Sequence, residues 1–352
     1  MMAWQDNVRS VVPYVPGEQP KVKNIIKLNT NENPYPPSPL VKKAMKEFDT
    51  DMLRLYPNPE AADLVKALAL HHEVEEENVF VGVGSDDVIA MSFLTFFNSK
   101  KPILFPDITY SFYNVWADLY HIPYERPILD DAFKIVKEDY YKENGGVIIP
   151  NPNAPTAIYE DLTVIKDIIC NNQDVVVIID EAYIDFGGKS ALELISKYKN
   201  LLVVQTYSKS RSMAGMRIGY AIGNKELIQC LNAVKNSYNS YTMNQTAIIA
   251  GVASLEDREY FNSMLNKVIG TRERAKEELS KLGFSFTDSK ANFIFATHKD
   301  VAAKEIFEAL KRENIYVRYF DSKRINNHLR ISIGTDEEME RLMDALKKYL
   351  NM

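Results

Sequence analysis

The sequence predicts an α/β protein with a large, mostly parallel sheet flanked by helices and a smaller α+β domain at the C-terminal end. The chain has 352 residues, enough for two domains or one large α/β domain with a substantial core. Between residues 36 and 243, short apolar runs alternate with segments of helical spacing. Continuous β-branched runs of this kind indicate strands buried on both faces of a sheet. The pattern after residue 243 differs and indicates a second domain.

The first 35 residues are expected to form an extended arm rather than a core element. They are rich in proline and asparagine, as in "PYVPGEQP" and "KLNTNENPYPPSP". Such stretches interrupt regular structure. Helical patterns follow the arm at about 38–49 and 59–72.

The predicted strands of residues 36–243 are short apolar runs that each end in polar or turn residues. They lie in "NVFVGVGSDD", "KPILFPDITY", "GGVIIPNPNAPT", "DVVVIIDEAY", "NLLVVQTYSKS" and "RIGYAIG". Segments with helical spacing, at 86–98, 110–120 and 161–171, lie between several of them. Strands that alternate with helices in this way favour a largely parallel sheet.

Residues 244–352 are expected to form the smaller α+β domain. An amphipathic helix over about 260–282 is followed by strand-like "FSFTD" and "NFIFATH", a helix at about 301–313, and two more strands in "IYVRYF" and "HLRISIG". Thr335 and Glu338 form a capping-box pattern at the start of a last helix. A crevice between two domains is a natural place for a ligand.

Composition and charge narrow the class of protein. Hydrophobic residues make up 46% and charged residues 26%, which is ordinary for a globular protein. The net charge of −6, without a basic stripe, argues against nucleic-acid binding. Cys170 and Cys230 form no C-x-x-C pair, so no disulfide framework is expected. No apolar signal core or membrane-length run is present, and we therefore expect a cytoplasmic protein with no membrane contact.

The first candidate site lies where the run "VFVGVG" meets a helical segment. In open α/β sheets, ligands bind outside the carboxyl ends of the strands. Gly84 allows close backbone approach, and the free N–H groups at Ser85 and Asp86 suit a phosphate. The same residues are also typical of a plain turn that caps a helix. It is not a dinucleotide fingerprint, because Asp87 replaces the third glycine.

Two further strand ends carry polar residues. Asp180 ends a buried run, where a carboxylate can keep a proton on a ring nitrogen, and Tyr183 could donate to a phenolic oxygen; a turn-forming aspartate is the alternative. Lys209 follows the next run, where a desolvated amine suits Schiff-base chemistry. Arg217 begins another run and could offer a bidentate fork to a phosphate. Taken alone, Lys209 could equally be one more surface lysine.

The order and spacing of these residues resemble the pyridoxal-phosphate-dependent aminotransferases of fold type I, over nearly the whole chain. Lys209 lies 29 residues after Asp180, and Arg217 follows eight residues later. The resemblance is strongest to the subgroup that acts on histidinol phosphate. It rests on the segments "LNTNENPYPPSP", "LYPNP", "ITYSFY", "DEAY" and "LRISIG".

The resemblance implies pyridoxal 5'-phosphate as cofactor and a role for each matching residue. Lys209 would hold the cofactor as a Schiff base and move a proton during catalysis. Asp180 would pair with the pyridinium nitrogen, which keeps the ring an electron sink. Tyr183 would bind the ring oxygen, and Tyr110 would stack on the ring. The phosphate would be held at Gly84, Ser85, Asp86, Ser208 and Arg217.

The resemblance also implies a homodimer and a substrate site. Tyr56 would reach the phosphate from the neighbouring subunit. Arg330 would grip the substrate carboxylate, while Arg318 and Tyr14 lie where the family reads a second anionic group. Asn31 belongs with this substrate-binding set, and no metal site is expected. How the two arginines divide the substrate anions between them is open.

One departure from the family pattern concerns the loop "NPNAPTA". Ala154 and Ala157 stand where the family has an asparagine and a glycine. The family's asparagine usually supplies a donor to the ring oxygen, and an alanine cannot donate. Either Tyr183 serves that oxygen alone, or Asn153 or Asn151 has shifted into the role. Asn153 is kept among the candidate cofactor-binding residues.

The implied activity is amino-group transfer between histidinol phosphate and 2-oxoglutarate, giving imidazole-acetol phosphate and glutamate, in histidine biosynthesis. An aminotransferase for aromatic or other amino acids and a threonine-phosphate decarboxylase are the alternatives within the enzyme class. A binding or regulatory protein with a degraded site is the alternative outside it, because a fold alone does not determine function.

Overall fold

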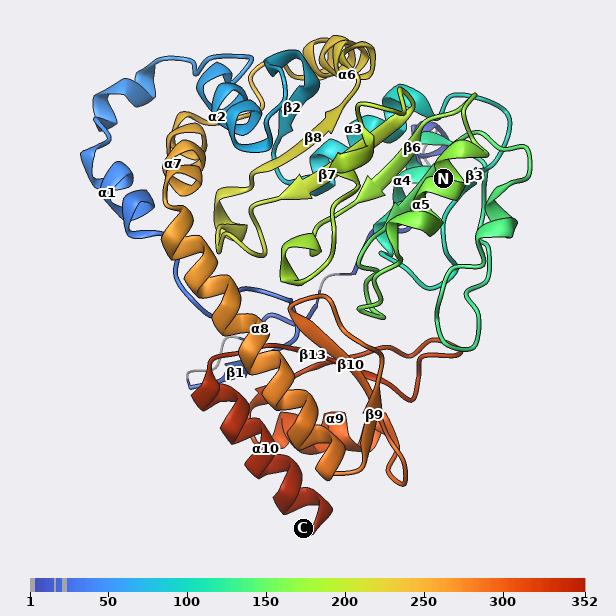
Figure 1. The fold of residues 1–352 in the computed structure, drawn as a ribbon, viewed down its shortest axis with the longest axis vertical. Coiled ribbons are helices and arrows are strands. Elements are labelled where there is room, and N and C mark those ends of the chain that lie inside the picture. The colour runs from blue at the N-terminus through green and yellow to red at the C-terminus, as the bar shows by residue number, and fades with distance from the viewer. Residues whose placement is uncertain (1–3, 16, 21–23, 352) are drawn as a thin grey trace.

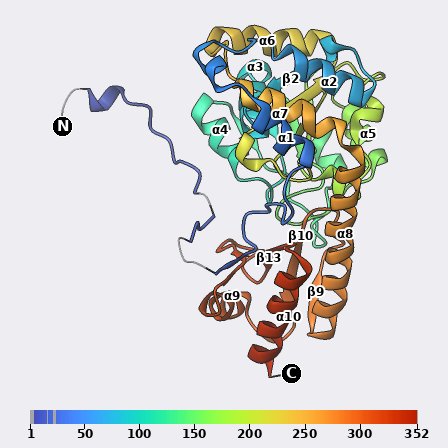
Figure 2. The ribbon, with the colours of Figure 1, turned by 90° about the vertical axis from the view of Figure 1, so that its left-hand side faces the viewer.

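The computed structural model describes residues 4–15, 17–20 and 24–351, which form two units joined by a long helix (Figure 1). A seven-stranded sheet lies in the upper unit of Figure 1, and a four-stranded sheet lies in the lower one. The joining helix is α8 (Arg258–Lys281), which runs from one unit into the other. Residues 4–15 lie to one side of both units in Figure 2.

The large sheet is mostly parallel, as the sequence predicts. Its strand order is β2-β8-β7-β6-β5-β3-β4. Only β8 runs antiparallel to its neighbours β2 and β7, and the other adjacent strands are parallel. The strands are β2 (Val79–Gly82), β3 (Ile103–Leu104), β4 (Tyr124–Glu125), β5 (Val147–Pro150), β6 (Val177–Asp180), β7 (Leu201–Thr206) and β8 (Gly219–Gly223).

Helices cover both faces of this sheet. Side chains alternate between the two faces along a strand. In β6, Ile178 packs with α3, α4 and α6, whereas Val177 and Ile179 pack with α5. The predicted burial on both faces is therefore confirmed. The helices are α2 (Ala62–His72), α3 (Ser85–Phe96), α4 (Phe112–Tyr120), α5 (Leu162–Cys170) and α6 (Lys225–Tyr238).

Helix α7 (Gln245–Glu256) packs with the large unit, although it follows the expected boundary at residue 243. It contacts α1 (Pro39–Glu47) and α2. Ala247 and Ile248 share a core with Val79 of β2. The division of the chain at residues 35 and 243 therefore stays a prediction.

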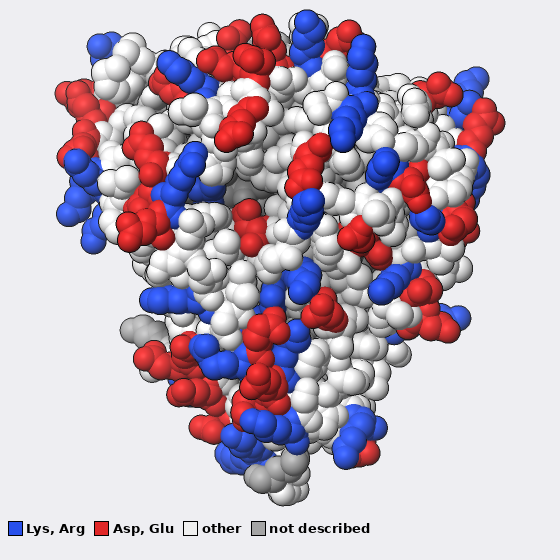
Figure 3. Space-filling view, in the orientation of Figure 1, with Lys and Arg blue, Asp and Glu red and all other residues white. Residues whose placement is uncertain are grey.

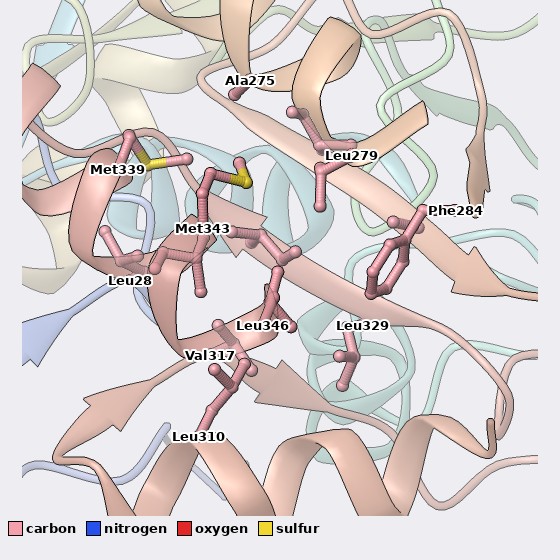
Figure 4. Close-up of a cluster of buried hydrophobic side chains, with 14 of the residues drawn as sticks. Leu28, Ala275, Leu279, Phe284, Leu310, Val317, Leu329, Met339, Met343 and Leu346 are labelled. Carbon is pink, nitrogen blue, oxygen red and sulfur yellow. The ribbon is translucent and has the colours of Figure 1, made fainter. Parts of the chain in front are cut away.

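The smaller unit combines an antiparallel sheet with three helices. Its strand order is β12-β13-β10-β9. Apolar side chains of α8, α9, α10 and the sheet meet in one core, which Figure 4 shows around Leu279, Leu310 and Leu346. The elements are β9 (Phe284–Phe286), β10 (Phe293–His298), β12 (Arg318–Tyr319), β13 (Leu329–Ser332), α9 (Ala303–Arg312) and α10 (Asp336–Leu350).

The predicted capping box opens α10. The backbone N–H of Glu338 donates to the Thr335 hydroxyl at 3.2 Å, and the Glu338 carboxylate accepts from the Thr335 N–H at 2.8 Å. Both bonds satisfy backbone donors that the first turn of a helix leaves free.

The expectation that the first 35 residues contain no core element is wrong for a short segment. The strand β1 (Ile26–Lys27) pairs in parallel with β11 (Ile315–Tyr316) of the small unit. Ile26 and Leu28 are each only 1% exposed and belong to the small-unit core. A two-residue strand between polar, proline-rich stretches leaves no periodic pattern, which explains why the sequence does not reveal it.

Charged side chains of both signs are mixed over the face in Figure 3, and no continuous basic area is visible among its described residues. This mixing agrees with the modest net charge of −6. Within the described ranges, every helix is too short or too polar to cross a membrane.

Candidate active site

The predicted residues meet at the carboxyl ends of the parallel strands in the large unit. A cavity of about 180 Å³ lies there. It collects residues from five separate strand ends and from the segment around residue 30, so the sheet topology creates the site. Its lining includes the predicted residues Ser85, Asp86, Tyr110, Asp180, Tyr183, Ser208, Lys209 and Arg217.

Lys209 lies three residues beyond the end of β7, and its side chain reaches into this cavity. The Nζ atom is 3.5 Å from the carbonyl oxygen of Thr30 and 5.6 Å from the ring centre of Tyr183. In the part of the chain that the structure describes, no carboxylate pairs with this amine. Glu32 and Asp180 line the same cavity and attract this amine, but neither holds it in an ion pair, so Nζ is available to react with a carbonyl.

The start of α3 forms a seat for an anion beside Lys209. Gly84 is the residue before the helix, and no side chain caps the first turn within the described chain. The first N–H groups of a helix have no acceptor inside the helix, and they attract negative groups. The Ser208 hydroxyl lies 3.0 Å from the Thr206 hydroxyl and lines the same cavity.

Arg217 completes this seat. It is the residue directly before β8, and its φ of 56° places it in the left-handed region. Its guanidinium pairs with Asp86 at 3.2 Å, while Asp86 also accepts from the Tyr110 hydroxyl at 2.9 Å. Asp86 therefore holds both the Arg217 guanidinium and the Tyr110 hydroxyl beside the first turn of α3. Burial, followed by the charge of Asp86, raises the pKa of Tyr110, so Tyr110 stays a neutral donor.

Two glycines allow the backbone segments of the seat to touch. A Cβ atom on Gly219 would lie 2.2 Å from the carbonyl carbon of Gly84 and 2.3 Å from the nitrogen of Ser85. A Cβ atom on Gly84, whose φ is +87°, would lie 2.5 Å from Arg217. Gly219 was not predicted as a site residue; its only signal in the sequence is its place at the start of "GYAIG", two residues after Arg217.

We expect Gly219→Ala to damage this seat. The added methyl would meet backbone atoms that have no room to move, so the first turn of α3 shifts. Overpacking of this kind costs about 1–3 kcal/mol of the free energy of unfolding. Urea denaturation measures the loss in the free energy of unfolding. Titration of cofactor into the cofactor-free protein measures how the shifted turn changes cofactor affinity.

Gly215→Ala is the matched control, because nothing lies within 4 Å of a Cβ atom at Gly215. Equal stability and equal cofactor affinity for the two variants would show that the close approach of β8 and α3 is unimportant.

Asp180 sits at the end of β6 and is 5% exposed. Burial raises the pKa of Asp180 from 3.8 to about 6, although hydrogen bonds from Tyr113 and Ala182 act in the opposite direction. The Tyr113 hydroxyl donates to the carboxylate at 2.7 Å, and the Ala182 N–H donates to it at 3.2 Å. A buried carboxylate in this state is stabilised by a nearby protonated nitrogen.

Tyr113 is a site residue that the sequence analysis missed. It is fully buried and anchors the Asp180 carboxylate from α4. Its signal was present in "ITYSFY", where it follows Tyr110 by three residues and so shares its face of the helix start.

Tyr183 lines the cavity opposite the seat. Its ring packs edge-on against Phe293, with centroids 5.1 Å apart. Its hydroxyl accepts a hydrogen bond from the Asn31 side chain at 3.0 Å. Ala154 also lines the cavity and packs in the same small apolar cluster as Tyr183. Position 154 thus supplies no donor to the cavity, and Tyr183, which packs against the same cluster, carries a hydroxyl.

The structure does not bring Asn153 or Asn151 into the cavity lining, so a cofactor role for either stays a prediction. The Asn153 amide donates to Ile108 and Thr156, each at 2.9 Å. The Asn151 amide donates to the carbonyl of Glu160 at 2.9 Å and accepts from its N–H at 2.8 Å. Both side chains are buried in the loop, outside the cavity lining, because they tie the loop to its surroundings.

Arg330 and Arg318 face each other on neighbouring strands of the small sheet. Arg330 donates to the carbonyl of Asn29 at 2.9 Å, its Nε is buried without an acceptor, and Phe293 and Phe320 lie beside its guanidinium. Burial lowers the pKa of Arg330, and the charge of Arg318 lowers it further. Neither arginine forms an ion pair with a carboxylate in the described chain, so two neighbouring guanidinium groups are available to a bound anion.

A larger cavity of about 800 Å³ adjoins the first one, since Tyr110 lines both. Arg318 and Tyr14 also line it, and Tyr14 stacks on Phe112 with centroids 4.1 Å apart. The structure therefore brings Tyr14 and Arg318 together on the outer side of Tyr110.

Five predicted residues line neither cavity: Gly84, Asn153, Arg330, Asn31 and Tyr56. Asn31, expected to bind substrate, is 1% exposed and donates to the Tyr183 hydroxyl, so the structure does not bring its side chain to either cavity. Tyr56 is 83% exposed and rests against Tyr241, away from the cavity of its own chain.

The residues around the smaller cavity fit pyridoxal phosphate. An unpaired lysine can hold its aldehyde, and the first turn of α3 with Ser208 and Arg217 can hold its phosphate. Asp180 can pair with its ring nitrogen, and the Tyr183 hydroxyl can reach its ring oxygen. The close approach at Gly84, where a Cβ atom would fill the seat, supports the same fit.

Comparisons with known proteins agree with this geometry. The family described as aminotransferase class I and II matches residues 23–346. A histidinol-phosphate aminotransferase of Lactococcus lactis subsp. cremoris is 53% identical over 349 residues, covering 99% of this chain and 98% of the relative.

Solved structures share the fold. The histidinol-phosphate aminotransferase of Clostridium acetobutylicum superimposes with a TM-score of 0.86 at 24% identity, covering 93% of this chain and 99% of that one. The Sinorhizobium meliloti enzyme, solved in complex with pyridoxal-5'-phosphate, gives a TM-score of 0.84 at 23% identity, covering 93% and 91%. The predicted fold is thereby confirmed. From the family match over most of its length and the relative at 53% identity, the chain belongs to the class I and II aminotransferases.

Proposed function

We propose that this chain transfers the amino group between histidinol phosphate and 2-oxoglutarate, with pyridoxal phosphate as cofactor, in histidine biosynthesis. One observation carries the proposal: Lys209 and the anion seat line a cavity that shares Tyr110 with a second cavity, and that second cavity is lined by Arg318, the cross-strand neighbour of Arg330. The relative at 53% identity, which bears the name of that activity, supports the choice of substrate.

The chain's own residues divide the work as follows. The bound cofactor supplies an electron sink for the carbon that carries the amine. Lys209 would hold the cofactor, and its Nζ, once free, would take the proton from that carbon and pass it to the cofactor's C4′ carbon. Asp180, fixed by Tyr113, keeps a proton on the ring nitrogen. Tyr183 directs its hydroxyl to the ring oxygen.

The two arginines can bind the anionic groups of either substrate. Histidinol phosphate carries one phosphate, and 2-oxoglutarate carries two carboxylates. Arg330 and Arg318 present two planar forks side by side, which suit either group by bidentate hydrogen bonds. One pair of cations can thus serve both substrates in turn, without a separate site for each.

An amine-donor screen tests the substrate assignment. Purified, cofactor-loaded protein is incubated with 2-oxoglutarate and histidinol phosphate, tyrosine, phenylalanine or threonine phosphate, and glutamate is measured. We expect histidinol phosphate to be the best donor by kcat/KM. Inert histidinol phosphate beside reactive tyrosine would mean an aromatic aminotransferase. Carbon dioxide released from threonine phosphate would mean a decarboxylase.

We further propose a cytoplasmic homodimer in which Tyr56 reaches the phosphate seat of the neighbouring subunit. The observation behind it is that Tyr56 is strongly exposed and lies beside the exposed apolar side chains Met52, Leu53 and Leu55. Exposed apolar groups that lie together favour an interface. We also propose that the chain divides at residues 35 and 243 into an arm and two domains, as the sequence predicts.

Tyr56→Phe is expected to weaken cofactor binding roughly tenfold, because it removes one hydrogen bond to a charged phosphate. Tyr238→Phe is the matched control, since Tyr238 is also exposed, at 76%, and has no predicted role. Sedimentation of the unaltered chain reports the oligomeric state. A monomer, or equal cofactor affinity for the two variants, would refute the shared site.

A further inference from the structure

We propose that Asn31 is a positioning residue for cofactor binding, which aims the Tyr183 hydroxyl proton into the cavity and so makes up for the missing donor at Ala154. The inference rests on the proposed function, because it assigns the ring oxygen of pyridoxal phosphate as the acceptor of that proton. It replaces the role in substrate binding that the sequence suggested for Asn31.

Four hydrogen bonds fix Asn31. Its N–H donates to the Ser332 hydroxyl, and that hydroxyl donates back to the Asn31 side-chain oxygen, both at 2.9 Å. Its carbonyl accepts from the Asn292 amide at 3.0 Å. Its own amide donates to the Tyr183 hydroxyl at 3.0 Å. The side chain is 1% exposed, so these partners rather than bulk solvent fix its direction.

The direction of the bond to Tyr183 follows from counting protons. The Ser332 hydroxyl has a single proton and is 2% exposed. It already accepts from the Asn31 N–H, so its proton must go to the Asn31 side-chain oxygen. The Asn31 NH₂ group is then the only part of the amide left to face Tyr183. A reversed amide would leave the buried Ser332 proton without an acceptor, which is costly.

The consequence lies on the cavity side of Tyr183. A phenol oxygen that accepts from Asn31 keeps its one proton for a different partner. Tyr183 lines the cavity, so that partner is a ligand there. Ala154 beside it cannot donate, and the amides of Asn151 and Asn153 are bonded within their own loop. Asn31 therefore supports the hydroxyl that serves this corner of the cavity.

The bond also links the two units. Asn31 belongs to the segment after β1, Tyr183 to the large unit, and Ser332 to β13 of the small unit. Arg330, two residues before Ser332, holds the backbone of Asn29. The strand that carries the anion-binding arginine thus also fixes the amide that orients Tyr183.

Two variants test the inference. Asn31 has a φ of 55°, which aspartate and glycine tolerate. Asn31→Asp keeps the shape but cannot donate; its carboxylate accepts from Tyr183 and pulls the proton away from the cavity. Asn31→Gly removes the amide and keeps the backbone. Asn314→Gly is the control, since Asn314 also has a left-handed φ, of 60°, and is exposed.

The main measurement is the dissociation constant of pyridoxal phosphate, titrated into cofactor-free protein. We expect Asn31→Asp to weaken binding roughly tenfold or more, Asn31→Gly to weaken it less, and Asn314→Gly to change it by less than about twofold. The midpoint pH of the bound cofactor's absorbance change is a second readout that a purely structural defect would not move. Thermal unfolding of the cofactor-free proteins checks that each variant folds.

A double-mutant cycle separates orientation of Tyr183 from a local structural effect. In a Tyr183→Phe background, Asn31→Asp is expected to change affinity by less than about twofold, because the hydroxyl is gone. Introducing Ala154→Asn into Asn31→Gly is expected to recover part of the loss. Equal effects of Asn31→Asp with and without the Tyr183 hydroxyl, or no effect at all, would overturn the inference. An unaltered chain that takes up no pyridoxal phosphate would instead refute the proposed function itself.

Discussion

Replacing Lys209 with methionine is expected to abolish transamination. Methionine has a similar length but no amine, so the cavity keeps its shape while the reactive group is lost. Positioned proton transfer alone contributes roughly 10²–10⁴-fold to a rate, and loss of the covalent anchor adds to that. The kcat with histidinol phosphate and 2-oxoglutarate measures the effect. Borohydride reduction of the unaltered, loaded protein is expected to attach the cofactor's mass at Lys209.

Lys189→Met is the matched control for this variant. The Lys189 side chain is 64% exposed and pairs with Glu193 on the surface. Surface pairs of this kind contribute little, so we expect unchanged activity. Activity of the Lys209 variant within about tenfold of the unaltered chain would exclude Lys209 as the proton carrier. Reduction that labels a different lysine would exclude it as the anchor.

The chemistry of the site was predictable from the sequence because parallel strands end at one edge of a sheet. Asp180 and Lys209 each follow an apolar run. Arg217 precedes β8, which runs antiparallel to β7, so strand pairing brings all three residues to the same edge. The residue types at the strand ends, together with the expectation of a mostly parallel sheet, were therefore enough to predict the site.

The missed and misplaced residues share a different cause. Asn31 and Tyr183 are 152 residues apart in sequence, and Asn31 and Ser332 are 301 apart. Hydrogen bonds over such separations leave no periodic pattern in the chain. Gly219 was missed for the same reason, since its role depends on a close approach to Gly84 from another strand. Local patterns predict elements, whereas contacts between distant loops require the structure.

Replacing Asp180 with asparagine is expected to have opposite effects on activity and on stability. The folded-state pKa of Asp180 is raised from 3.8 to about 6 by burial. The folded, cofactor-free protein therefore binds this proton more tightly than the unfolded chain does. Its free energy of unfolding falls as the pH rises from about 4 to 6, by about 3 kcal/mol at most, since each pKa unit corresponds to about 1.4 kcal/mol.

Asparagine removes this cost because it carries no charge. Its amide can still accept from Ala182, and the Tyr113 hydroxyl can rotate to accept from it. At about pH 8 we expect cofactor-free Asp180→Asn to unfold with a free energy about 1–3 kcal/mol above the unaltered chain, and at about pH 4 the difference should vanish. Urea denaturation at several pH values measures this difference.

The difference between variant and unaltered chain is the informative quantity. Burial lowers the pKa of His72 to about 3, and burial raises the pKa of Glu181 to about 7. The neutral histidine costs stability as the pH falls below about 6.5, whereas the raised glutamate costs stability as the pH rises from about 4.5 to 7. These opposed contributions flatten the pH profile of either protein alone. They cancel when the two profiles are subtracted, which leaves Asp180.

The same substitution is expected to lower kcat by roughly a thousandfold, since the neutral amide cannot hold a proton on the ring nitrogen and the electron sink is weakened. A stabilised but inactive variant means that Asp180 is kept for catalysis at a cost to the cofactor-free fold. Asp180→Glu offers a check, because it retains the charge in a less suitable position. If Asp180→Asn gains no stability at about pH 8, or gains equally at about pH 4, the buried carboxylate is not the source of the cost.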